Sequence, residues 1–211
     1  MARRTMSDTT PDTERDAGLA ETWRLFVAID VGAAAREAIR AAQERCRAKG
    51  LPLRPIYPAG AHLTLRFLGA TDPARVPALV TALRAVAVAH GPFALHTAAP
   101  GLFPNTARAR VLWLGLAGPP ERLLALQRAT EAALIGCGVP RESQPFVPHL
   151  TIGRIAASAA PPAAQITALL ATLPVAAAPL PVAAIHLVRS TLTPGGAKYA
   201  TLLTAPLCEA A

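Results

Sequence analysis

The stretch HLTLRFLG at residues 62–69 decides the fold, because its opening returns as HLTI at residues 149–152. Both copies are short runs rich in β-branched and apolar residues, which predicts a strand in each half of the chain. Side chains alternate between the two faces of a strand, so His62 and Thr64 are expected on one face and the leucines on the other. Each copy therefore offers an imidazole and a hydroxyl to one surface and packs its apolar residues against a core.

Outward from these two motifs, strands alternate with helices along the whole chain. Apolar residues at helical spacing indicate helices, and runs of apolar and β-branched residues indicate strands. They predict strands at 24–30, 62–68, 93–98, 111–116, 146–152, 184–189 and 198–204, and helices at 33–49, 73–90, 120–136 and 164–173. This order is typical of an α+β protein rather than of a helical bundle or an all-β sandwich.

Proline and glycine mark the connections between these elements. Three prolines within residues 52–58 predict an extended, non-helical connection, and residues 101–105 are rich in turn formers. Pro194-Gly-Gly196 suits a hairpin turn between the last two strands. Residues 1–23 contain no long apolar stretch, so we expect a flexible tail there without a secretory signal, followed by one domain over residues 24–211.

Composition sets limits on the class of protein. A chain of 211 residues can bury one sizeable core, either as a single domain or as two small lobes folded together. No run approaches the roughly 18 apolar residues that a membrane-spanning helix requires, so no membrane contact is expected. The three cysteines are widely spaced and form no C-x-x-C pattern, which argues against a disulfide framework or a zinc site and favours a cytoplasmic location.

The net charge of +8 suits an anionic partner such as nucleic acid. This charge comes from 19 arginines and only 2 lysines in a chain rich in alanine and proline, which indicates a general composition bias. The expectation of a nucleic-acid ligand must therefore come from the motifs.

Two imidazoles suit the opening of a cyclic phosphodiester. One group must take a proton from the attacking water while another gives a proton to the departing ribose oxygen. The ordinary pKa of imidazole, near 6.5, lets one ring be neutral and the other protonated at cellular pH. Hydroxyls such as those of Thr64 and Thr151 can donate hydrogen bonds to the non-bridging oxygens. This chemistry on His62 and His149 needs neither a metal nor an organic cofactor.

Five stretches, in their order along the chain, resemble a known family. RLFVAID at 24–30, HLTLRFLG at 62–69, GLFPNTARARVLWLGL at 101–116, PFVPHLTIGR at 145–154 and IHLVRSTLTPGGAKY at 185–199 are similar to the 2H phosphoesterase superfamily. Within it they resemble the RNA 2′,3′-cyclic phosphodiesterases, also known as bacterial and archaeal 2′-5′ RNA ligases. The resemblance implies a bilobal α+β fold in which two antiparallel sheets flank a central groove, with helices on the outer faces.

The same resemblance implies site residues. His62 would give a proton to the leaving 3′ oxygen and His149 would activate water, while Thr64 and Thr151 hold the phosphate; the residues alone do not decide which imidazole is the acid. Arg154 is similar to a phosphate-contacting arginine of the family, five residues after the second histidine. Simple alternation sets it on the opposite face, unless a bulge at the preceding glycine reverses the parity.

Three further side chains have weaker claims. Arg66 has the strand parity of the first motif, so it is a candidate for substrate binding. Phe26 could stack on a base in the groove, but core packing is favoured. Trp113 lies in an apolar run and is expected in the core.

The expected activity is hydrolysis of RNA 2′,3′-cyclic phosphate ends to 2′-phosphomonoesters. The ligand would be RNA or a nucleotide bearing that end, and we expect a monomer. Ligation of RNA through a 2′-5′ linkage is an alternative on the same fold, and a non-catalytic RNA-binding module is another. Metal binding by the two histidines is disfavoured because neither motif carries a carboxylate or cysteine ligand beside its histidine.

Overall fold

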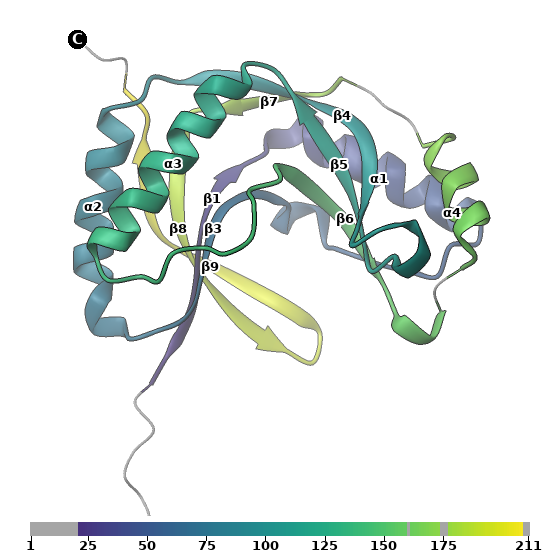
Figure 1. The fold of residues 1–211 in the computed structure, drawn as a ribbon, viewed down its shortest axis with the longest axis horizontal. Helices are drawn as coiled ribbons and strands as arrows, with labels where there is room; N and C mark the ends of the chain where they lie inside the picture. Colours follow the sequence, from purple (N-terminus) through teal and green to yellow (C-terminus); the bar gives the residue numbers. More distant parts are fainter. Residues whose placement is uncertain (1–20, 160, 174–176, 209–211) are drawn as a thin grey trace, which may run out of the picture.

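Two antiparallel sheets form the frame of the computed structural model, which describes residues 21–159, 161–173 and 177–208 (Figure 1). Sheet A has four strands in the order β3 (His62–Thr71), β1 (Trp23–Asp30), β8 (Ala184–Thr193) and β9 (Gly196–Pro206). Sheet B has five strands in the order β2 (Leu53–Pro55), β6 (His149–Ile155), β5 (Val111–Ala117), β4 (Phe93–Phe103) and β7 (Pro179–Val182). Most of the tail expected over residues 1–23 lies outside the described residues.

Helices cover one face of each sheet. The helices are α1 (Gly32–Ala48), α2 (Val76–Val88), α3 (Pro120–Gly136) and α4 (Ala163–Leu170). The two longest helices, α1 and α3, each pack on the sheet to which their preceding strand does not belong. Helix α1 follows β1 of sheet A but packs on β6, β7 and β4 of sheet B, whereas α3 follows β5 of sheet B and contacts β3 of sheet A. Helix α2 packs beside α3 and against β8 and β9 (Figure 1). The predicted α+β class, with two antiparallel sheets and helices on the outer faces, is confirmed.

Each motif strand pairs with the strand that precedes a long helix. Strand β3 pairs antiparallel with β1, and α1 lies between these two strands in the sequence. Strand β6 likewise pairs antiparallel with β5, and α3 lies between them in the sequence. Leu63 and Leu150, which follow the two histidines, are fully buried in one continuous core that also receives the helices. The faces that carry the histidines point away from this core, and we call them the inner faces. Strands β3 and β6 contact each other where the two sheets meet.

Both motif strands contain a β-bulge at the same place. In β3, Leu65 is the extra residue, because Val27 pairs with Arg66 and Ala28 with Thr64. In β6, the extra residue is Ile152. One extra residue reverses the alternation of side chains beyond it. The residue five positions after each histidine therefore returns to the inner face.

Two short strands and several boundaries differ from the prediction. Strands β2 and β7 were missed, because each contains proline, yet each forms an edge of sheet B where a missing N–H is tolerated. Strand β6 begins at His149 rather than at residue 146, since Pro148 cannot donate to the ladder. Strand β4 continues through Phe103, across part of the loop expected at 101–105. Within the described part of the chain, no helix is both long and apolar enough to cross a bilayer.

The β6 bulge gives a stability prediction. A Cβ on Gly153 would lie 2.7 Å from the carbonyl oxygen of Arg54 and 2.7 Å from Cγ of Leu53. Gly153→Ala therefore forces β2 away from β6, and we expect the free energy of unfolding in urea to fall by about 1–3 kcal/mol.

Gly136→Ala is the matched control, because a Cβ there meets nothing within 4 Å. It should leave stability unchanged or raise it by less than about 1 kcal/mol. Equal stability of the two variants would contradict the role given to Gly153.

Candidate active site

The two motif histidines are held in the same way at the starts of their strands. Nδ1 of His62 lies 2.8 Å from the carbonyl oxygen of Gly60, and Nδ1 of His149 lies 2.7 Å from that of Val147. A carbonyl oxygen can only accept, so Nδ1 carries the hydrogen in both rings. Nε2 is therefore the titrating atom of each ring, and it can accept a proton when the ring is neutral or donate one when it is charged.

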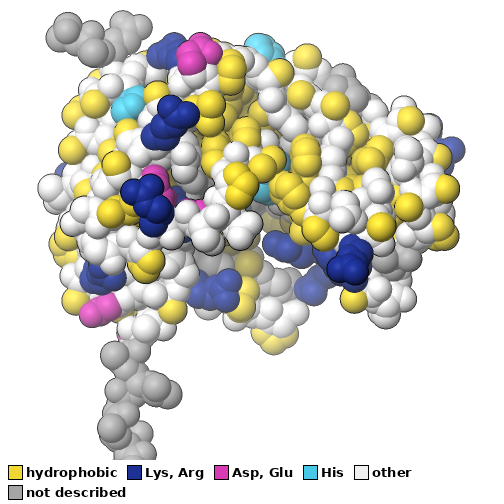
Figure 2. All heavy atoms as spheres, in the orientation of Figure 1, with side chains coloured by type: hydrophobic (Ala, Val, Ile, Leu, Met, Phe, Trp, Pro, Cys, Tyr) yellow, Lys and Arg dark blue, Asp and Glu magenta, His cyan; other side chains and the backbone are white. Residues whose placement is uncertain are grey.

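The imidazoles are close enough to influence each other electrostatically. Burial is the main cause that lowers the pKa of His62, the bond to Gly60 opposes it, and the positive charge of protonated His149 lowers it further. Burial likewise lowers the pKa of His149, against the bond to Val147, and the charge of Arg154 adds to the lowering. The surface is hollowed between the part over α2 and α3 and the part over β5 and β6 (Figure 2).

Aromatic rings surround each imidazole. Phe26 stacks on His62 with ring centroids 4.6 Å apart, and Tyr199 meets the same imidazole edge-on at 5.3 Å. On the other sheet, Phe103 meets His149 edge-on at 4.9 Å. These contacts bury the rings partly and restrict their rotation, which explains why desolvation dominates both pKa shifts.

The threonines and one arginine share the inner faces with the histidines. Thr64 and Thr151 are half-buried, while the residues on either side of each are fully or almost fully buried on the core side. The β6 bulge brings Arg154 to the inner face, where it is exposed. The parity reversal considered for this strand is present, although the extra residue is Ile152 rather than the glycine itself.

Comparison with known families identifies the chain. The family described as the 2'-5' RNA ligase superfamily matches residues 31–193, which include both motif strands. The chain belongs to this superfamily.

Individual members of the superfamily are similar over most of their length. An RNA 2',3'-cyclic phosphodiesterase of Thermus thermophilus is 33% identical over 187 residues, which cover 85% of this chain and 87% of that protein. The crystal structure of TT0787 of Thermus thermophilus has a TM-score of 0.74 at 27% identity and covers 89% of this chain and all of that one. LigT of Escherichia coli in its apo form has a TM-score of 0.67 at 28% identity, covering 90% and 99% of the two chains.

Arg66 does not lie where alternation predicted. The β3 bulge turns it away from His62 and Thr64, and its side chain is only 8% exposed. Its Nε lies 2.5 Å from a carboxylate oxygen of Glu131 on α3, and one terminal nitrogen lies 2.9 Å from Glu142. The parity assigned to Arg66 is therefore wrong, and its guanidinium joins β3 to α3 and to the segment before β6.

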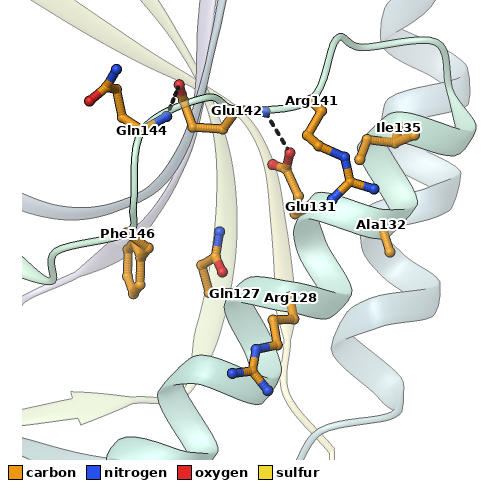
Figure 3. Close-up of a pocket in the computed structure, with 9 residues that line it drawn as sticks. All are labelled: Gln127, Arg128, Glu131, Ala132, Ile135, Arg141, Glu142, Gln144 and Phe146. Carbon is orange, nitrogen blue, oxygen red and sulfur yellow. Dashed lines mark hydrogen bonds between the residues drawn. The ribbon is translucent and has the colours of Figure 1, made fainter.

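A cavity of about 310 Å³ lies beside this ion-pair network rather than at the histidines (Figure 3). Figure 3 shows Glu131 reaching from α3 to the backbone N–H of Glu142, while Glu142 accepts from the N–H of Gln144. Arg66 also donates to the carbonyl oxygen of Pro140. The segment that leads to His149 is thus fastened to α3 and β3 by side chains from both.

Several inner-face aromatics escaped the sequence analysis. Trp113 was expected in the core, but it pairs with Thr151 and its ring centroid lies 6.0 Å from that of His149. Phe67 is 60% exposed and comes to the inner face through the β3 bulge, where it contacts Phe26. A bulge at Leu65 carries no glycine or proline signal, so alternation alone could not locate the ring of Phe67.

Removing the Arg66 side chain should be costly for stability. Arg66→Met leaves the carboxylate of Glu131, which is mostly buried, without its partner. We expect the free energy of unfolding to fall by about 3–5 kcal/mol, as measured by urea denaturation.

Arg84→Met is the matched control, since Arg84 is exposed on α2. It should change stability by less than about 0.5 kcal/mol. If Arg66→Met proved as stable as the control, the buried ion pairs would contribute nothing measurable.

Proposed function

We propose that the chain hydrolyses RNA 2′,3′-cyclic phosphate ends to 2′-phosphomonoesters, with His62 and His149 as the acid and the base. The observation that carries the proposal is the pair of imidazoles whose Nδ1 atoms are both bonded to carbonyl oxygens, so that both Nε2 atoms are available to move protons. Membership of the superfamily supports it, as does the name RNA 2',3'-cyclic phosphodiesterase carried by relatives.

The reaction requires an in-line exchange at phosphorus. Nε2 of neutral His149 takes a proton from water as its oxygen bonds to phosphorus, and Nε2–H of protonated His62 gives a proton to the departing 3′ oxygen. The P–O3′ bond breaks, and the phosphate stays on the 2′ oxygen. The net change is the addition of one water.

The surrounding charges favour this division of roles over its reverse. The positive charge of Arg154 lowers the pKa of His149 and so favours its neutral form, which is the form that a base needs.

The remaining inner-face groups suit a nucleotide phosphate. Hydroxyls of Thr64 and Thr151 can donate to the non-bridging oxygens, and the guanidinium of Arg154 can balance their charge. Exposed rings of Phe67 and Tyr199 offer flat apolar surface on which a base can stack. Arg66 is engaged in its ion pairs and is not assigned to the substrate.

RNA ligation is the second candidate, because the matching superfamily is described by that activity. In ligation the 5′-hydroxyl of a second RNA takes the place of water: its oxygen bonds to phosphorus, the P–O3′ bond breaks, and a 2′-5′ linkage results. Incubation with RNA halves that carry a cyclic phosphate and a 5′-hydroxyl separates the two, since joined product indicates ligation and a 2′-monoester indicates hydrolysis.

Loss of either imidazole should abolish most of the activity. We expect His62→Ala and His149→Ala each to lower kcat by about 10²–10⁴-fold, measured with a nucleoside 2′,3′-cyclic phosphate in EDTA. His90→Ala, at the end of α2, is the control and should retain wild-type turnover. Full activity in either motif variant would refute the acid–base roles.

The pH profile tests the assignment of roles. Because both pKa values are lowered, the bell-shaped profile of kcat/KM should have its maximum below the ordinary imidazole pKa of about 6.5. Arg154→Met removes a positive charge and raises the pKa of His149, so the acidic limb, where the base loses its proton, should move to higher pH. Movement of the alkaline limb alone would mean that His149 is the acid.

A further inference from the structure

Two arginines lie directly opposite each other on neighbouring strands of sheet B. Arg54 on β2 pairs with Arg154 on β6, and both side chains are exposed. The adjacent pair, Leu53 and Ile155, packs on the core side of the sheet, so the two arginines share the inner face. Like charges opposite each other across two strands destabilise a sheet.

Neither charge is neutralised within the described residues. The ion pairs of that part of the chain involve other arginines, and none includes Arg54 or Arg154. An unbalanced pair of cations at the edge of a reaction site is an arrangement that anions can stabilise.

The backbone holds Arg54 firmly in this place. Nε2 of Gln43 on α1 donates to the carbonyl oxygens of both Ile56 and Ile152, each at 2.9 Å, and so joins the β2 side to the bulge. The N–H of Ile56 donates to the same oxygen of Ile152 at 3.1 Å. Gly153 lets the backbone of Arg54 approach closely. The two arginines are therefore held side by side on a fixed edge rather than on a mobile loop.

We propose that Arg54 binds the phosphodiester immediately upstream of the cyclic phosphate, so that the preferred substrate is an oligoribonucleotide end rather than a free nucleoside 2′,3′-cyclic phosphate. The inference rests on the proposed function, which assigns Arg154 to the reacting phosphate. Arg54 lies on the edge strand β2, next to Arg154 on β6. The two adjacent cations can therefore each contact one of two successive phosphates of an RNA chain. A planar guanidinium can bond both non-bridging oxygens of a phosphodiester.

Three substrates test the proposal. These are adenosine 2′,3′-cyclic phosphate, diadenosine with a 2′,3′-cyclic phosphate end, and the same dinucleotide with a neutral methylphosphonate linkage. For Arg54→Met we expect kcat/KM to fall about tenfold on the charged dinucleotide, through loss of one charge-assisted contact. Turnover of the mononucleotide and of the neutral dinucleotide should stay at the wild-type level.

Arg47→Met is the matched control, because Arg47 is exposed on α1, which covers the other face of sheet B. It makes the same change in net charge and should leave all three substrates unaffected. An equal loss on all three substrates in Arg54→Met, no loss on any, or the same pattern in Arg47→Met would overturn the proposal. Absence of turnover by the wild-type protein on every substrate would instead refute the proposed function on which it rests.

Discussion

The β-bulge that follows each H-x-T motif is the constraint on which the site depends. Up to the bulge, alternation sets histidine and threonine on the inner face and leucine or isoleucine in the core. Beyond it the parity reverses, so Phe67 and Arg154 reach the inner face while Arg66 and Gly153 turn toward the core side. These two core-side residues differ in size and in contacts. The long side chain of Arg66 reaches Glu131 on α3, whereas Gly153 has no side chain and lets the backbone of β2 approach closely.

The two motif strands thus have the same backbone arrangement but different side chains beside their histidines. Each imidazole has the same carbonyl contact and the same tautomer, yet the residue five positions later is a neutral aromatic on one wall and a cation on the other. A symmetric pair of histidines would have no reason to differ in protonation. The charge of Arg154 lowers the pKa of His149, whereas the equivalent position after His62 holds an uncharged phenylalanine.

Sequence reasoning was sufficient where local pattern determines structure. The helix at 120–136 matches α3 at both ends, and in each motif the histidine and the threonine share one face of a strand as expected. It failed where register with another strand decides the outcome. Leu65 looks like any strand residue, so nothing nearby reveals that it is the extra one, and Arg66 was assigned to the wrong face as a result. Trp113 was misplaced because an apolar run fits either face of a sheet.

The exchange of helices between the sheets affects how the two halves depend on each other. Helix α1 follows a strand of sheet A but packs on sheet B, and α3 follows a strand of sheet B but packs on sheet A. A fragment that ended after α2 would carry β1 and β3 together with a helix whose apolar face belongs to strands the fragment lacks. Neither half can therefore bury the apolar face of its own long helix without the sheet of the other half.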